Sequence, residues 1–173
     1  MRTVTVSPYD PLWAIKYAEE AEKIKAILGD ELITIHHIGS TSVPGLSAKP
    51  IIDILVEVRQ IDAIDSCNPA FIHLGYEPRG EFGIPCRRFF RKGGDEHRSH
   101  HVHIFQTGDP NIVEHLAFCA FLRCHPEDAT AYGDLKKSLA LQYPNDIEQY
   151  MDGKDSLIKE IRARALAWFK NVP

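Results

Sequence analysis

The most apolar stretch of the chain, Ile51 to Val58, carries a carboxylate at its third residue, Asp53. Its many β-branched residues predict a strand, in which side chains alternate between two faces. Every even-numbered position from 52 to 58 is Ile or Val, whereas Asp53 shares the other face with Leu55 and Glu57. Burying an unpaired charge costs several kcal/mol. Asp53 is therefore expected to bind a metal, to act as a base, to face solvent or to pair with an arginine.

A loop rich in glycine, proline and hydroxyl residues, residues 39–50, precedes this strand and follows another strand predicted over Leu32–Ile38. Glycines let a ligand approach the backbone, and the amides of such loops can bind phosphate. The loop lacks the residue order of a Walker phosphate loop, and a polar surface connection is the alternative. The candidate phosphate-binding residues in it are Gly39, Ser40, Thr41, Ser42 and Lys49.

Histidines gather in a strand predicted over Arg98 to Phe105. His101 and His103 face the same way in such a strand, with their Cβ atoms about 7 Å apart, so they can share one cation if a third ligand arrives. We expect them on the same open face as Asp53, with Val102 and Ile104 buried. A solvated face that carries histidines is the alternative.

Basic residues mark the preceding strand, Arg87 to Lys92, and Gly93-Gly94 predicts a hairpin between the two strands. Guanidinium groups suit phosphate or carboxylate recognition, and they suit a solvated hairpin surface equally well. We predict that Arg87 and Arg88 join the loop as phosphate ligands.

The order of the elements predicts the fold class. Val4 and Val6 indicate a short strand, a helix opens at Asp10-Pro11 and ends at Gly29, and residues 61–74 indicate a helix that Asn68-Pro69 interrupts. After residue 106 only helices are expected, over about 109–123, 125–141 and the last twenty residues. This order predicts an α+β fold with a mixed sheet flanked by helices. We expect a single domain over residues 1–173, with a sheet-rich core (1–107) and a helical C-terminal part (108–173).

Composition narrows the class of partner. Acidic residues outnumber basic ones 24 to 20, for a net charge of −4, which argues against a nucleic-acid partner. No apolar run approaches the roughly 20 residues of a spanning helix, so no membrane partner is expected. The N-terminus lacks the apolar run of a secretory signal, and the four cysteines are interpreted as reduced thiols of a cytoplasmic protein.

The run from His37 to Ile54 resembles the glutamate-rich GrpB family. Further blocks that resemble the family are Tyr9–Trp13, Glu81–Phe90, His101–His103 and Phe121–Pro126. The resemblance implies a nucleotidyltransferase-like fold, in which a Gly-Ser turn precedes a strand with two acids at alternate positions. Those acids hold divalent ions during phosphoryl transfer. Here Gly39-Ser40 match the turn and Asp53 the first acid, but the second acid position is Leu55.

The resemblance thus implies a metal-dependent nucleotidyltransferase that acts on an unspecified acceptor. In this enzyme Asp53 is the catalytic residue and a metal ligand. A further ligand from His101, His103 or Glu81 completes the site, and Mg²⁺ or Zn²⁺ is the cofactor. Leu55 keeps open a second hypothesis, a non-catalytic module that binds a nucleotide or coenzyme A. A third is a hydrolase with a metal on His101 and His103. The expected partner is a nucleotide or a phosphorylated small molecule.

Overall fold

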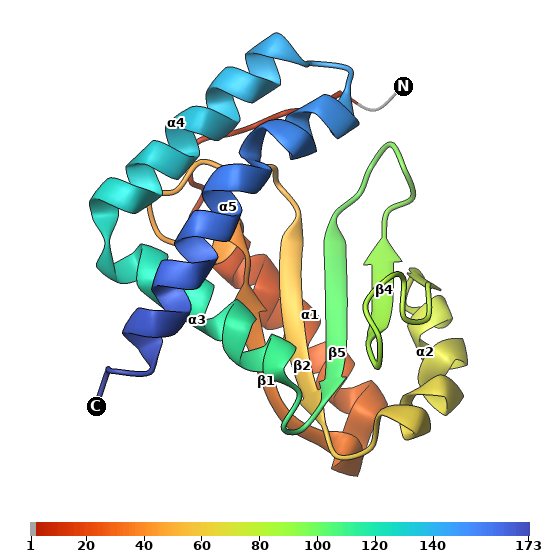
Figure 1. Ribbon diagram of the computed structural model, residues 1–173. Coiled ribbons are helices and arrows are strands. Elements are labelled where there is room, and N and C mark those ends of the chain that lie inside the picture. Colours follow the sequence, from red (N-terminus) through yellow and green to blue (C-terminus); the bar gives the residue numbers. More distant parts are fainter. Residues whose placement is uncertain (1–2) are drawn as a thin grey trace.

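The computed structural model describes residues 3–173 (Figure 1). Its strands are β1 (Leu32–Ile38), β2 (Ile52–Val58), β3 (Tyr76–Pro78), β4 (Arg88–Lys92) and β5 (His100–Gln106). Its α-helices are α1 (Leu12–Leu28), α2 (Asn68–His73), α3 (Pro110–Cys124), α4 (Pro126–Gln142) and α5 (Ile147–Phe169). Three 3-10 helices join them, η1 (Gly29–Glu31), η2 (Ser40–Ser42) and η3 (Ile61–Cys67).

The five strands form one mixed sheet in the order β1-β2-β5-β4-β3. The central strands β2 and β5 are parallel, and the other neighbours pair antiparallel. In the parallel pair Asp53 lies opposite His101, and Leu55 lies opposite His103. Because opposite residues share a face, this register brings Asp53 and the two histidines together.

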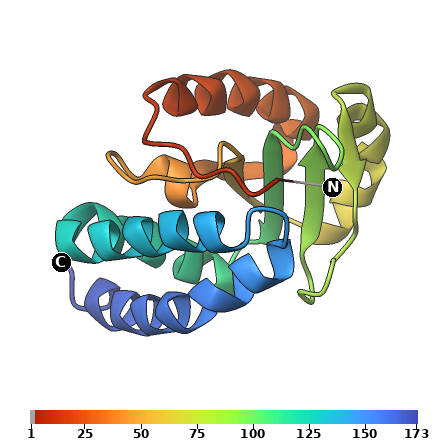
Figure 2. The ribbon, with the colours of Figure 1, turned by 90° about the horizontal axis from the view of Figure 1, so that it is seen from above.

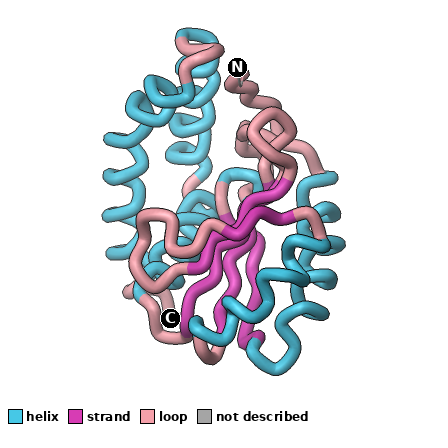
Figure 3. Tube along the Cα trace, turned by 90° about the vertical axis from the view of Figure 1, so that its right-hand side faces the viewer, coloured by secondary structure: helices cyan, strands magenta, loops and turns pink. Residues whose placement is uncertain are grey.

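Helices cover both faces of the sheet. Figures 2 and 3 show α1 and α2 on one side and the three C-terminal helices on the other. The first side forms the main apolar core, which includes Ile54, Val102 and Ile104, all without exposed surface. On the second side α3 packs against Leu55 and Phe105, and α4 and α5 form a further cluster with α3. All strands precede residue 107 and the long helices α3, α4 and α5 follow it, which confirms the predicted α+β order.

Local signals set several element ends. The Asp10 carboxylate accepts a hydrogen bond from the Leu12 amide at 2.9 Å, and Asp109 accepts one from the Asn111 amide at 2.8 Å. These bonds satisfy amides that the first helical turn leaves without backbone partners. The hairpin of β4 and β5 forms around Gly93-Gly94, as expected.

Three local features differ from the predictions. Val4 and Val6 form no strand, because the neighbouring backbone makes only an isolated bridge between Ser7 and Ala48. Residues 61–74 form η3 and then α2 rather than one interrupted helix, since Pro69 stands in the first turn of α2, where its missing N–H costs nothing. The short edge strand β3 was not expected.

Among residues 3–173, no helix is long and apolar enough to cross a membrane. All four cysteines carry free thiols.

Candidate active site

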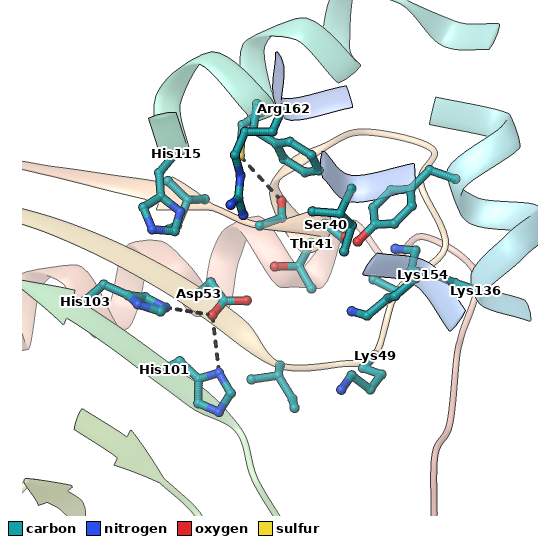
Figure 4. A pocket seen from close by; sticks show the side chains of 18 of the residues that line it. Ser40, Thr41, Lys49, Asp53, His101, His103, His115, Lys136, Lys154 and Arg162 are labelled. Atoms are coloured by element: carbon teal, nitrogen blue, oxygen red, sulfur yellow. Dashed lines mark hydrogen bonds and ion pairs between the residues drawn. The ribbon is translucent and has the colours of Figure 1, made fainter. Parts of the chain in front are cut away.

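A pocket of about 380 Å³ opens between the Asp53 face of the sheet, the loop of residues 39–51 and helices α3, α4 and α5. Its lining includes Gly39, Ser40, Thr41, Lys49, Asp53, His101 and His103. Figure 4 shows the two imidazoles on one side of Asp53 and the lysines on the other. The structure therefore gathers most of the predicted site residues around one cavity, although it does not test their roles.

The turn at Gly39 holds the loop against Asp53. Gly39 has a φ of 72°, and a Cβ atom there would lie 2.7 Å from Asp53 Oδ2. Only glycine combines this backbone conformation with such a close approach. The Ser42 hydroxyl donates to the Gly39 carbonyl at 2.6 Å, and Thr41 Oγ1 lies 2.9 Å from His37 Nε2. Ser42, a predicted phosphate ligand, thus closes the turn and is not part of the pocket lining.

Asp53 interacts with both predicted histidines. His101 Nδ1 lies 3.3 Å and His103 Nε2 lies 3.2 Å from the same oxygen, Asp53 Oδ1. Desolvation opposes ionisation of the carboxyl group, but hydrogen bonds from the two imidazoles outweigh it and hold the pKa of Asp53 below its usual value. Asp53 is therefore a carboxylate at neutral pH. The prediction that the three side chains share one face is confirmed, and Val102 and Ile104 are buried.

The arginines predicted as phosphate ligands lie elsewhere. Arg87 is buried, and its guanidinium donates to the carbonyls of Glu81 and Phe82 at 3.1 and 2.7 Å. Arg88 faces the α1 side of the sheet and pairs with Asp65 of η3 at 2.7 Å. Neither arginine lines the pocket. The physical reason is that adjacent strand residues point to opposite faces, and that Arg87 precedes β4 and anchors its own loop.

Glu81, which was also considered as a metal ligand, makes a hydrogen bond within the loop that precedes β4. Its Oε1 accepts a hydrogen bond from the Cys86 amide at 2.8 Å, and it is not part of the pocket lining.

Lysines from the C-terminal helices supply the positive charge instead. Lys136 of α4 and Lys154 of α5 are 2% and 9% exposed and line the pocket with Lys49. Lys136 Nζ is buried and has no hydrogen-bond partner within residues 3–173. Burial, together with the charges of Lys154 and Lys49, lowers the pKa of Lys136 to about 7.

The sequence analysis missed Lys136 and Lys154, although a signal for them exists. Each lysine follows a tyrosine by four residues in its helix, Tyr132 in α4 and Tyr150 in α5, so each pair shares a helix face. The ammonium groups lie 4.4 and 5.1 Å from the centroids of these rings. A Cβ atom at Gly153 would collide with Leu139, so glycine there lets α5 approach α4 closely.

Helices α3 and α5 also contribute Glu114, His115 and Arg162 to the lining of the pocket. Burial, and secondarily the neighbouring imidazole of His103, lowers the pKa of His115 to about 4. His115 is therefore a neutral imidazole at pH 7. None of these three residues was singled out from the sequence.

The donor set does not fit a metal site built by the protein alone. Within residues 3–173 no three His, Cys, Asp or Glu side chains are arranged to hold a metal ion. Both imidazoles lie at hydrogen-bonding distance from one oxygen of Asp53, Oδ1. The cation predicted on Asp53, His101 and His103 stays a prediction.

Comparison with known proteins identifies the family. The family described as "GrpB protein" matches residues 3–164. The UPF0157 protein YqkA of Bacillus subtilis is 48% identical over 169 residues, which is 98% of this chain and 49% of that protein. The chain thus spans about half the length of this relative.

Solved structures agree with the fold. The crystal structure of the conserved protein GrpB from Enterococcus faecalis has a TM-score of 0.93 and 46% identity, covering 96% of this chain and all of that one. The Cid1 poly(U) polymerase with MgGTP bound has a TM-score of 0.54 and 14% identity, covering 78% of this chain and 44% of that one. At such low identity the second likeness concerns the fold alone, which is nucleotidyltransferase-like.

Proposed function

This chain belongs to the GrpB family, and we propose that it binds the phosphates of a nucleoside triphosphate in the pocket beside Asp53 and transfers the nucleotidyl group to an acceptor. The observation that carries the proposal is the buried Lys136 ammonium, which has no hydrogen-bond partner within the described residues. A buried charge without a partner is costly, and an anionic ligand removes that cost.

The charge around the pocket supports a polyphosphate over a neutral ligand. Lys49, Lys136, Lys154 and Arg162 line it, against the carboxylates Asp53 and Glu114. Ser40 and Thr41 bring the Gly-Ser turn to the same cavity. Figure 4 shows Asp53 across the pocket from the lysines. In this proposal the α-phosphate of a triphosphate bound by the lysines lies beside Asp53.

The proposed transfer forms a bond from an acceptor oxygen or nitrogen to the α-phosphorus. It breaks the bond between that phosphorus and the oxygen leading to the β-phosphate, so pyrophosphate leaves and the acceptor loses one proton. In this reaction the lysines would offset the charge that develops on the leaving pyrophosphate. Asp53 stays ionised and can orient the acceptor group.

A second candidate, binding without transfer, is favoured by Leu55. At the position where the superfamily pattern has its second acid, Leu55 has no exposed surface and packs with Ile38 and Phe105. Release of pyrophosphate in the presence of a pool of hydroxyl and amine acceptors separates the two candidates. Binding with no pyrophosphate release would support the second.

Ligand binding tests the shared part of both candidates. ATP, GTP, CTP, UTP and coenzyme A, each at millimolar concentration, are added in a thermal-shift assay, because a ligand that binds only the folded state raises the melting temperature. Lys136→Met should weaken triphosphate binding by about tenfold or more, the worth of one charge-assisted contact. Lys137→Met is the matched control, since Lys137 is the next residue of α4 and is half exposed, beside Asp134. No shift with any of these ligands, or equal affinity in the Lys136 and Lys137 variants, would contradict the proposal.

The pKa of Lys136 adds a pH dependence. Because the free ammonium titrates near pH 7, raising the pH from 6 to 9 should weaken triphosphate binding more in the wild type than in Lys136→Met. Lys49, Lys154 and the ring of Tyr132 are the groups that face it. Identical pH profiles in the two proteins would remove Lys136 from the binding site.

The predicted divalent cation belongs to this proposal as well. Mg²⁺ usually takes one or two carboxylates and completes its shell with substrate phosphates and water. Titration of ATP in EDTA, Mg²⁺ or Zn²⁺ tests whether a cation strengthens binding, with Asp53→Asn as the variant that should lose the effect.

A further inference from the structure

Each imidazole beside Asp53 has an arginine at its other ring nitrogen. Arg98 Nη1 lies 3.3 Å from His101 Nε2, and Arg87 Nη1 lies 3.3 Å from His103 Nδ1. A guanidinium has only N–H donors and keeps its charge in proteins, so the facing ring nitrogen must accept. The ring proton is then on the other nitrogen, which faces Asp53.

We propose that Arg98 and Arg87 are positioning residues that fix the tautomers of His101 and His103, so that both rings donate to Asp53 and neither can ligate a metal ion. His101 then carries its proton on Nδ1 and His103 on Nε2. These two ring nitrogens lie 3.3 and 3.2 Å from the same Asp53 oxygen. The proposal accounts for why two histidines and a carboxylate meet in a pocket without forming a metal-binding group.

Both arginines are held in place by other contacts. The Arg98 side chain is 6% exposed, and it donates to the Gly94 carbonyl at 2.6 Å and to Asp95 at 2.8 Å. Arg87 is equally buried, and two of its three guanidinium nitrogens donate to loop carbonyls. Neither guanidinium can leave its imidazole without breaking these bonds.

The tautomers have a chemical consequence for the pocket. To bind a metal from the Asp53 side, each ring would have to move its proton to the nitrogen that faces an arginine, where two N–H donors would oppose each other. Ions that prefer imidazole, such as Zn²⁺, are therefore disfavoured. A cation that shares the pocket with a triphosphate would be an oxygen-preferring ion such as Mg²⁺, and only this last step rests on the proposed function.

Nuclear magnetic resonance of the ligand-free wild type tests the tautomers directly. Long-range proton–nitrogen correlation spectra of uniformly ¹⁵N-labelled protein distinguish a protonated from an unprotonated ring nitrogen. The expected result is protonated Nδ1 in His101 and protonated Nε2 in His103. The opposite tautomer in either ring, or a rapid average of the two, would overturn the proposal.

Metal affinity tests the role of the arginines. Co²⁺ and Zn²⁺ titrations compare the wild type with Arg98→Met, which removes the donor, and Arg98→Lys, which retains one. Arg98→Met should raise affinity about ten- to a hundredfold, the usual size of effects from partners of metal-binding histidines. Arg98→Lys should stay near the wild type, and adding Asp53→Asn to Arg98→Met should abolish the gain.

Arg91→Met is the matched control, because Arg91 lies opposite His101 in the sheet but pairs with Glu77 and Asp95. It should change neither the tautomers nor the metal affinity. Tight Zn²⁺ binding by the wild type, or a folded Arg98→Met variant without a gain, would refute the proposal. If Arg98→Met does not fold, the wild-type spectra and Arg98→Lys still decide, and since no nucleotide is present, the result is independent of the proposed function.

Discussion

The two faces of strands β2 and β5 have different roles, although the same two strands supply both. On the α1 face, Ile54, Val102 and Ile104 have no exposed surface, and each such side chain contributes about 1.5–3 kcal/mol through burial. On the opposite face, Asp53 and His101 keep 28% and 23% of their side chains exposed to the pocket. The alternation of side chains along one strand thus separates the residues that stabilise the fold from those that line the pocket.

The second face is not polar along its whole length. Two residues after Asp53, Leu55 is fully buried under α3. The boundary between the pocket and the core therefore runs between Asp53 and Leu55. The predictions below test that boundary and the contrast between the faces.

Leu55→Asp should have the largest effect and prevent folding. The change places an unpaired carboxylate in an apolar cluster with Phe105 and Ile112. Its cost of more than about 4 kcal/mol approaches the roughly 5–15 kcal/mol by which a whole domain is stable. Circular dichroism and urea unfolding measure it, and Leu55→Met is the control that should cost less than about 1.5 kcal/mol. A Leu55→Asp protein that folds and binds Mg²⁺ would instead show that position 55 belongs to the pocket and can hold the second acid.

Ile54→Ala should lower the free energy of unfolding by about 2–5 kcal/mol, because it leaves a cavity in the main core. Denaturant titration measures the change. Leu141→Ala, at a side chain that is 84% exposed, should change stability by less than about 0.5 kcal/mol. Equal effects of the two variants would contradict the assignment of this face to stability.

Asp53→Asn should lower the free energy of unfolding by about 1–3 kcal/mol at pH 7, since two imidazole N–H groups lose a charged acceptor. The folded-state pKa of Asp53 lies below its ordinary value. Its stabilising contribution is therefore complete above an unfolded pKa of about 3.9 and is lost as the pH falls further. The difference between wild type and variant should shrink below about pH 4 in thermal unfolding. A variant that is more stable than the wild type at pH 7 would show that the imidazoles do not stabilise the carboxylate.

Arg88→Ala should have the smallest effect. Its partners Asp62 and Asp65 are exposed, so the ion pairs are worth about 1 kcal/mol or less. Because Arg88 faces away from the pocket, triphosphate affinity should stay within about twofold of the wild type, in contrast to Lys136→Met. Calorimetric titration with a triphosphate measures the affinities of the Arg88→Ala and Lys136→Met variants. A loss of affinity in Arg88→Ala as large as that in Lys136→Met would show that Arg88 belongs to the phosphate site.

Much of the site could be predicted because strand alternation is a local property. Alternation along β5 placed His101 and His103 on one face, and Gly39-Ser40 indicated the turn that approaches Asp53. That Asp53 shares the face of the histidines follows from the parallel register of β2 and β5. The same rule shows why Arg87 and Arg88 could not both face the pocket. Their actual partners, the loop carbonyls and Asp65, depend on how a loop and η3 fold back.

The sequence by itself determined strands β1, β2, β4 and β5 and the long helices, since each follows from neighbours a few residues apart. It also placed His101 and His103 on one face of β5. The parallel pairing of β2 with β5, a tertiary contact, decided that Asp53 shares this face. Only the tertiary structure decided which cations meet Asp53 across the pocket. Lys136 and Lys154 lie more than eighty residues beyond Asp53 in the sequence, and nothing in their local pattern fixes where α4 and α5 dock. Docking of these helices leaves the Lys136 and Lys154 residues only 2% and 9% exposed, because long-range contacts, and not local propensity, select the partner of a buried charge.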